Sequence, residues 1–121
     1  MSEAAEHKEI VQWFKAKWPS HRKAVRVSMS GLPRHGRKGA VQWNMMKGQG
    51  VEEGESDIAI LLPKNGYGSL LIEHKADEAM RGATQAQLDY IEYHNENGNC
   101  ACVTKGVDMA KAAITQYMEG Q

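Results

Sequence analysis

Two short apolar runs separated by a turn constrain this chain more than any other feature. Residues 58–62 read IAILL, residues 70–72 read LLI, and the intervening residues 63–68 read PKNGYG. The glycine and asparagine content of the intervening segment is typical of a hairpin loop. Because the runs are continuously apolar and do not alternate, we expect strands that are covered on both faces. The sequence therefore predicts a β-hairpin inside a layered domain.

A helical pattern precedes the predicted hairpin. Ile10, Phe14 and Trp18 recur every four residues and would form one stripe on a helix. The pattern predicts a helix over residues 3–18, which ends because Pro19 cannot continue it. Its apolar stripe would face the body of the domain.

A second helix is predicted after the hairpin, where the chain turns polar. Thr84 and Gln87 have the spacing of a capping box, in which each side chain bonds the backbone of the other residue. We expect the core face of this helix to include Leu88 and Ile91, and the helix to end near residues 97–98, an Asn-Gly pair.

The chain as a whole is predicted to form one mixed α/β domain over residues 1–121, with helices on both sides of a small sheet. The remaining predicted elements are a strand at 24–29, a basic, glycine-rich loop at 30–39, a short helix at 40–47, a strand at 99–104 and a final helix along 110–118.

The charges of the chain are segregated, although its 15 basic and 15 acidic residues balance. Residues 10–51 contain no Asp or Glu but nine Lys or Arg residues, whereas residues 52–121 contain twelve acids and five bases. A basic region of this kind attracts polyanions, and nucleic-acid phosphates are the commonest partner. The alternative is a solvated surface whose bases pair with acids elsewhere in the fold.

Membrane insertion and secretion are not expected from this sequence. No apolar run approaches the roughly 18–20 residues that a membrane-spanning helix needs. The N-terminal residues MSEAAEHKEI carry acids where a signal peptide has a basic segment followed by an apolar one. We expect a cytoplasmic protein without a membrane partner.

Charged residues at the ends of the two hairpin strands predict a site. Asp57 precedes the first strand, and Glu73 and Lys75 end the second, where they would share one face while His74 points to the other. Antiparallel pairing would bring Asp57 close to Glu73 and Lys75. Taken singly, Asp57 can be a turn cap, and Glu73 with Lys75 an ordinary surface pair.

Two converging carboxylates suit Mg²⁺ or Mn²⁺, which would relieve their mutual repulsion. Glu6 lies one helical turn before Ile10 and is a candidate for a further metal-binding carboxylate, with Glu3 as the competing candidate. Alternatively, Glu6 only complements the dipole of its helix, and Gln87 only completes the capping box. With Lys75 as the positively charged group, this set predicts a site that cleaves phosphodiesters.

These motifs, in this order, resemble the PD-(D/E)XK nuclease superfamily and, within it, the VRR-NUC nucleases. The resemblance is carried by Gly54-x-x-Asp57, Glu73-x-Lys75 and Gln87, and it covers nearly the whole chain. It implies a restriction-endonuclease-like core. With its minimal length, the chain looks like the stand-alone bacterial and phage members of the family. That likeness implies a homodimer that cuts branched DNA, such as four-way junctions, inside a bacterial or phage-infected cell.

The resemblance also implies a role for each matching residue. Asp57 and Glu73 would bind the metal together with the backbone carbonyl of His74, with Lys75 as the catalytic lysine, Glu6 as the helical acid and Gln87 as a supporting residue. Ser56 departs from the family pattern, because proline usually precedes the aspartate. A short hydroxyl side chain can also begin the strand, so we expect the activity to be retained.

The expected activity is metal-dependent hydrolysis, in which Lys75 orients the attacking water. Arg34, Arg37, Lys38 and Lys47 are the candidate contacts to the DNA backbone. Two other functions stay open on the sequence alone. One is a monomeric nuclease directed to flaps or ends, and the other is a DNA-binding module that keeps the fold without the chemistry.

Overall fold

The computed structural model describes residues 1–28, 36–50 and 52–120, without the side chains of residues 36–39 and 43. The elements in chain order are α1 (Glu3–Lys17), the 3-10 helix η1 (Pro19–Ala24), β1 (Val25–Val27), α2 (Gly36–Gly48), β2 (Ile58–Ile60), β3 (Leu70–Lys75), α3 (Gln85–Glu96), β4 (Cys100–Lys105) and α4 (Val107–Glu119).

The four strands form one mixed sheet in the order β1-β2-β3-β4. The pairs β1–β2 and β2–β3 are antiparallel, and β3–β4 is parallel, with α3 in the connection between them. The predicted hairpin is therefore correct. In its register, Ile58 lies opposite Ile72 and Ile60 lies opposite Leu70.

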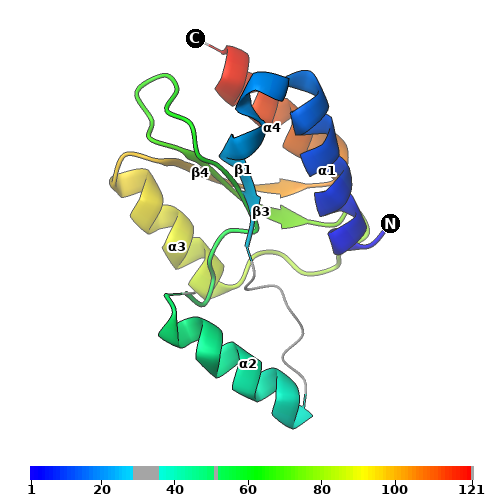
Figure 1. Cartoon of the computed structure of the whole chain (residues 1–121), viewed down its shortest axis with the longest axis vertical. Coiled ribbons are helices and arrows are strands. Elements are labelled where there is room, and N and C mark those ends of the chain that lie inside the picture. The colour runs from blue at the N-terminus through cyan, green and yellow to red at the C-terminus, as the bar shows by residue number, and fades with distance from the viewer. Residues whose placement is uncertain (29–35, 51, 121) are drawn as a thin grey trace.

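The apolar core lies between the sheet and the pair α1 and α4. Ile10 and Phe14 from α1, Ile114 from α4, and Ile58 and Ile72 from the sheet are completely buried in one cluster. Figure 1 shows α1 and α4 together against one face of the sheet and α3 on the other side. The prediction of a small mixed sheet with helices on both sides is confirmed.

Local signals explain where α1 begins and ends. The side chain of Ser2 accepts a hydrogen bond from the backbone nitrogen of Ala5, which satisfies one of the free amides of the first turn. The helix ends at Lys17, and Pro19 opens η1 directly after it. Glu3 and Glu6 occupy the first turn of α1, so this helix presents acids at the end where its dipole is positive.

Two elements differ from the prediction. The helix α2 begins at Gly36, within the segment that the glycine content assigned to a loop, whereas residues 29–35 lie outside the described residues. In α3, Leu88 is 44% exposed, so the prediction that it belongs to the core face is wrong. The reason is that α3 packs beside β4 at one edge of the sheet, where it covers less surface than α1 and α4 do.

In the part of the chain that the structure describes, every helix is too short or too polar to cross a bilayer.

Candidate active site

The hairpin brings two carboxylates together at one end of the sheet. Because Ile58 pairs with Ile72, Asp57 lies opposite Glu73, one residue beyond the paired segment. The backbone nitrogen of His74 donates a hydrogen bond of 2.9 Å to Oδ2 of Asp57. Asp57 and Glu73 are both buried, with exposed fractions of 9% and 1%. Two buried acids in contact are expected only where a positive charge offsets them.

The carboxylate of Glu73 is only partly satisfied by its positively charged neighbour, Lys75. Its Oε1 lies 3.3 Å from Nζ of Lys75, while its buried Oε2 has no hydrogen-bond partner among the described residues. Burial, and then the neighbouring charge of Asp57, raise the pKa of Glu73 to about 8. Burial also raises the pKa of Asp57. An unpartnered buried oxygen beside a second carboxylate is a donor set that fits a divalent cation.

Lys75 is held over this site by two partners. Besides Glu73, its Nζ donates a hydrogen bond of 3.2 Å to Oε1 of Gln87 on α3. The same oxygen accepts the backbone N–H of Thr84, and the Gln87 backbone N–H donates to Thr84 Oγ1. The predicted capping box is therefore present, and Gln87 combines the capping role with a contact to Lys75.

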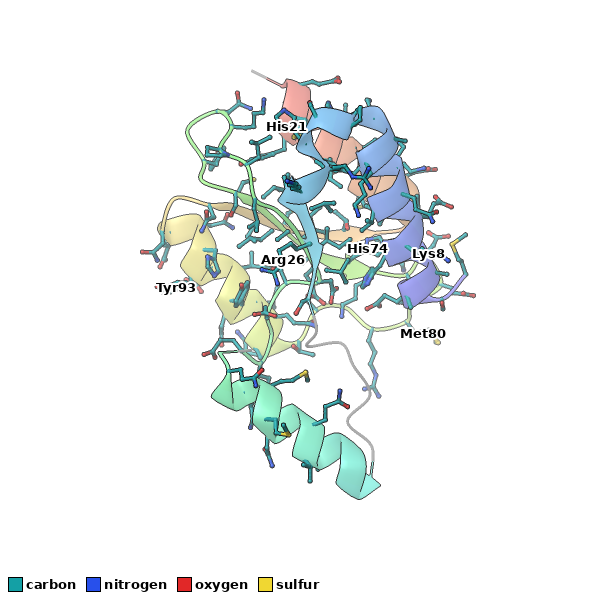
Figure 2. The ribbon with its side chains drawn as sticks, in the orientation of Figure 1. Lys8, His21, Arg26, His74, Met80 and Tyr93 are labelled. Atoms are coloured by element: carbon teal, nitrogen blue, oxygen red, sulfur yellow. The ribbon has the colours of Figure 1, made fainter. Side chains whose placement is uncertain are left out.

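His74 and Glu6 face the other side of the sheet from Lys75. The His74 ring is completely buried, with Nε2 at 2.8 Å from Glu6 Oε1 and Nδ1 at 2.7 Å from Thr104 Oγ1. Figure 2 shows His74 in the interior of the molecule, near α1. The second oxygen of Glu6, Oε2, accepts the backbone N–H of Asp77 at 3.1 Å.

These contacts occupy both carboxylate oxygens of Glu6. Burial alone would disfavour its ionised form, but the hydrogen bonds from His74 and Asp77 outweigh burial and lower the pKa of Glu6. The structure therefore brings Asp57, Glu73 and Lys75 together as expected, but it does not bring the carboxylate of Glu6 into their group.

A different pair on α1 lies against the site. Glu3 and His7 each offer a ligand atom to a cluster with Asp57, and these atoms all lie within 4.8 Å of one another. His7 Nε2 is 3.9 Å from Asp57 Oδ2, and burial lowers the pKa of His7. His7 was not among the residues predicted from the sequence. The available signal was its separation of four residues from Glu3, which places both side chains on one helical face.

Of the three comparisons with known proteins, the one with solved structures finds a similar fold. Neither the protein-family models nor the curated proteins contain a match. Among solved structures, the chain is similar to a VRR_NUC domain protein, with a TM-score of 0.80 and 27% sequence identity over 98% of this chain and 89% of the other. This likeness supports assignment of the chain to the VRR-NUC family. The chain therefore has the fold of a nuclease domain, and the acid and histidine cluster lies where the hairpin of that fold ends.

The candidate DNA-contacting residues are only partly described. Lys47 is exposed near the end of α2. Arg37 and Lys38 belong to the first turns of α2, although their side chains lie outside the described atoms, and Arg34 lies outside the described residues altogether. Figure 1 shows α2 set apart from the sheet and from the other helices. The helix that carries Arg37, Lys38 and Lys47 therefore projects from the body that carries the carboxylates.

Proposed function

We propose that this VRR-NUC domain is a divalent-cation-dependent DNA endonuclease that hydrolyses phosphodiester bonds in branched DNA, four-way junctions in particular, as a homodimer. The observation that carries the proposal is the convergence of Asp57, Glu73 and Lys75 at the end of the hairpin, with a buried oxygen of Glu73 left without a hydrogen bond among the described residues.

The residues that would hold the cation are Asp57, Glu73 and the backbone carbonyl of His74. The N–H and C=O groups of one strand residue point to the same side of the strand. Because the N–H of His74 donates to Asp57, its carbonyl also faces Asp57. When bound, the cation would supply the positive charge that stabilises the additional negative charge on the phosphate.

Lys75 is the group best placed to act on the attacking water. Its ammonium group is anchored between Glu73 and Gln87, so it has a fixed position without being buried in the core. From there it would orient a water molecule toward the scissile phosphorus and offset the charge that develops in the transition state. Hydrolysis forms the new P–O bond from that water and breaks the bond to the leaving sugar oxygen, with no covalent enzyme intermediate.

The acid-free stretch of the chain supports DNA as the substrate. Its nine bases include Lys47 on α2, the helix that projects from the body of the domain. Contacts between these bases and phosphates would give affinity that falls with salt and depends little on sequence. The branched substrate rests on the resemblance of the sequence motifs to stand-alone VRR-NUC nucleases. Symmetric cutting of a four-way junction would then need two sites related by a two-fold axis, as a homodimer provides.

The test is cleavage of a labelled panel of four-way junction, flap, single-stranded and plain duplex DNA with Mg²⁺ or Mn²⁺. We expect the unmodified protein to make paired, symmetric nicks in the junction, and Lys75→Ala to make none. Lys105→Ala is the matched control, because Lys105 is exposed on β4 directly opposite Lys75 and is expected to be dispensable.

Each other outcome contradicts a different part of the proposal. Cutting of flaps or ends alone, by a protein that sediments as a monomer, would replace the junction-cutting homodimer with a flap- or end-directed nuclease. DNA binding without cutting by any variant would leave a binding module. Equal activity of Lys75→Ala and Lys105→Ala would remove Lys75 from the mechanism.

A further inference from the structure

His7 faces the metal-binding carboxylates from a separate element of the fold. Glu3 and His7 lie four residues apart on α1, so both side chains leave the helix on the same face. Their ligand atoms and that of Asp57, which begins the hairpin, all lie within 4.8 Å of one another. Ligand atoms this close to one another can bind a single divalent cation.

The imidazole of His7 lacks the partner that a buried polar atom normally has. Its Nε2 is inaccessible to solvent and makes no hydrogen bond among the described residues. The ring packs edge-on against the ring of His74, with centroids 5.6 Å apart and an angle of 65°, so its orientation is fixed by packing. Leaving a buried nitrogen unsatisfied costs free energy unless something else binds it.

A second unsatisfied atom flanks the same aspartate. Glu73, with an exposed fraction of 1%, has a buried Oε2 without a hydrogen bond in the part of the chain that the structure describes. Glu73 comes from β3 and His7 from α1, and Asp57 lies next to both. A cation bound among Glu3, His7 and Asp57 would satisfy the His7 nitrogen, which makes no hydrogen bond to the described residues.

We propose that His7 is a nitrogen ligand of the divalent cation, alongside Asp57 and Glu3, and that it makes the site prefer transition-metal ions to Mg²⁺. The inference rests on the proposed cation dependence and deepens it. Mg²⁺ favours an all-oxygen shell, whereas first-row transition metals accept imidazole readily. A site of carboxylates alone would show this preference more weakly.

The test measures the binding of Co²⁺, Mn²⁺ and Mg²⁺ to the full chain by isothermal titration calorimetry, without DNA. In His7→Gln we expect Co²⁺ affinity to fall at least about ten-fold and Mg²⁺ affinity to change much less, because only the nitrogen donor is replaced. The visible absorption of bound Co²⁺ should change at the same time. His21→Gln is the matched control, since His21 lies in η1, far from His74 in Figure 2.

A second measurement needs no variant and stays informative if His7→Gln fails to fold. Wild-type protein carrying ¹⁵N-labelled histidine is loaded with Mn²⁺, and the electron spin echo is examined for modulation by a histidine nitrogen. We expect that modulation to be present. Its absence would overturn the inference, as would equal losses of Co²⁺ and Mg²⁺ affinity in His7→Gln. If the wild type bound none of the three cations, the cation dependence of the proposed function would fail as well.

Discussion

Glu73 makes the stability of the cation-free protein depend on pH. Burial and the charge of Asp57 raise its pKa from 4.5 to about 8. Between these two values the folded protein holds a proton that the unfolded chain releases, so the free energy of unfolding falls as pH rises through this window. With EDTA present, we expect the melting temperature to drop by several degrees from pH 5 to pH 8.5, as measured by circular dichroism.

Two variants assign this pH dependence to the site. Glu73→Gln removes the titrating group and should flatten the melting curve against pH. Glu92→Gln makes the same chemical change at an exposed position on α3 and should leave the dependence as it is in the wild type. A saturating divalent cation should raise the melting temperature most at the alkaline end. An unchanged slope in Glu73→Gln would contradict the assignment.

Gly54 allows the segment before Asp57 to pass close to α3. Its φ is +80°, and a Cβ there would lie against the backbone carbonyl of Ala86 and 2.9 Å from the backbone nitrogen of Gln87. Gly66 has a similar φ of +87° but nothing within 4 Å. We expect Gly66→Ala to cost about 1 kcal/mol of unfolding free energy and Gly54→Ala at least about 3 kcal/mol. Urea denaturation measures both, and equal costs would mean that the close approach is unimportant.

At the scale of single residues, the sequence predicted the part of the site that lies on the hairpin. Antiparallel pairing alone brings Asp57 to Glu73, and strand alternation alone puts Lys75 on the same face. The contribution of α1 could not be predicted in the same way. Periodicity correctly predicted that Glu6 faces the body of the domain. The partner that each side chain meets depends on tertiary packing, which places Glu6 against His74 and His7 beside Asp57.

At the scale of elements, α3 links the stability of the domain to the position of Lys75, the proposed catalytic lysine. Thr84→Ala removes one hydrogen bond of the capping box, and we expect a cost of about 1 kcal/mol with cleavage unchanged. Gln87→Ala removes the other half of the box and also the contact to Lys75. It should cost a similar free energy of unfolding and lower the cleavage rate about ten-fold, because Lys75 loses an anchor.

Measured together, chemical denaturation and single-turnover cleavage separate the two roles of Gln87. Equal cleavage rates in Thr84→Ala and Gln87→Ala would show that Gln87 acts only as a cap.

Elements with strong local signals were predicted correctly from the sequence. The two wrong predictions, a buried Leu88 and a loop at the start of α2, have physical causes. The hairpin, α1 and the capping box depend on residues close together in the chain, and all three are present. The burial of Leu88 depends on how much of the sheet α3 covers, which is a property of packing and not of periodicity. The first turn of α2 contains two glycines. Because glycine is a poor helix former, these residues predicted a loop where the structure has a helix.

At the scale of the whole molecule, the separation of charge predicts how DNA binding responds to salt. If Arg34, Arg37 and Lys38 contact phosphates, each contact adds about 0.9 to the slope of log affinity against log salt concentration. We expect alanine at all three positions to reduce the slope by up to about three, as measured by fluorescence anisotropy with duplex DNA.

The matched control removes the same charge elsewhere. Alanine at Lys64, Lys105 and Lys111 should change the slope much less, because these bases lie outside the acid-free stretch. Equal slopes in the two triple variants would mean that overall charge, and not this stretch, governs the affinity.

The hairpin also bears on the order in which the chain folds. β2 and β3 are close in sequence and can pair early, whereas α1 joins them from the distant N-terminal end of the chain. Asp57 and Glu73 can therefore meet before Glu3 and His7 arrive. A complete ligand shell would exist only after α1 has docked, late on the folding pathway. A bound cation should then slow unfolding far more than it accelerates folding, and so increase the kinetic stability of the folded protein.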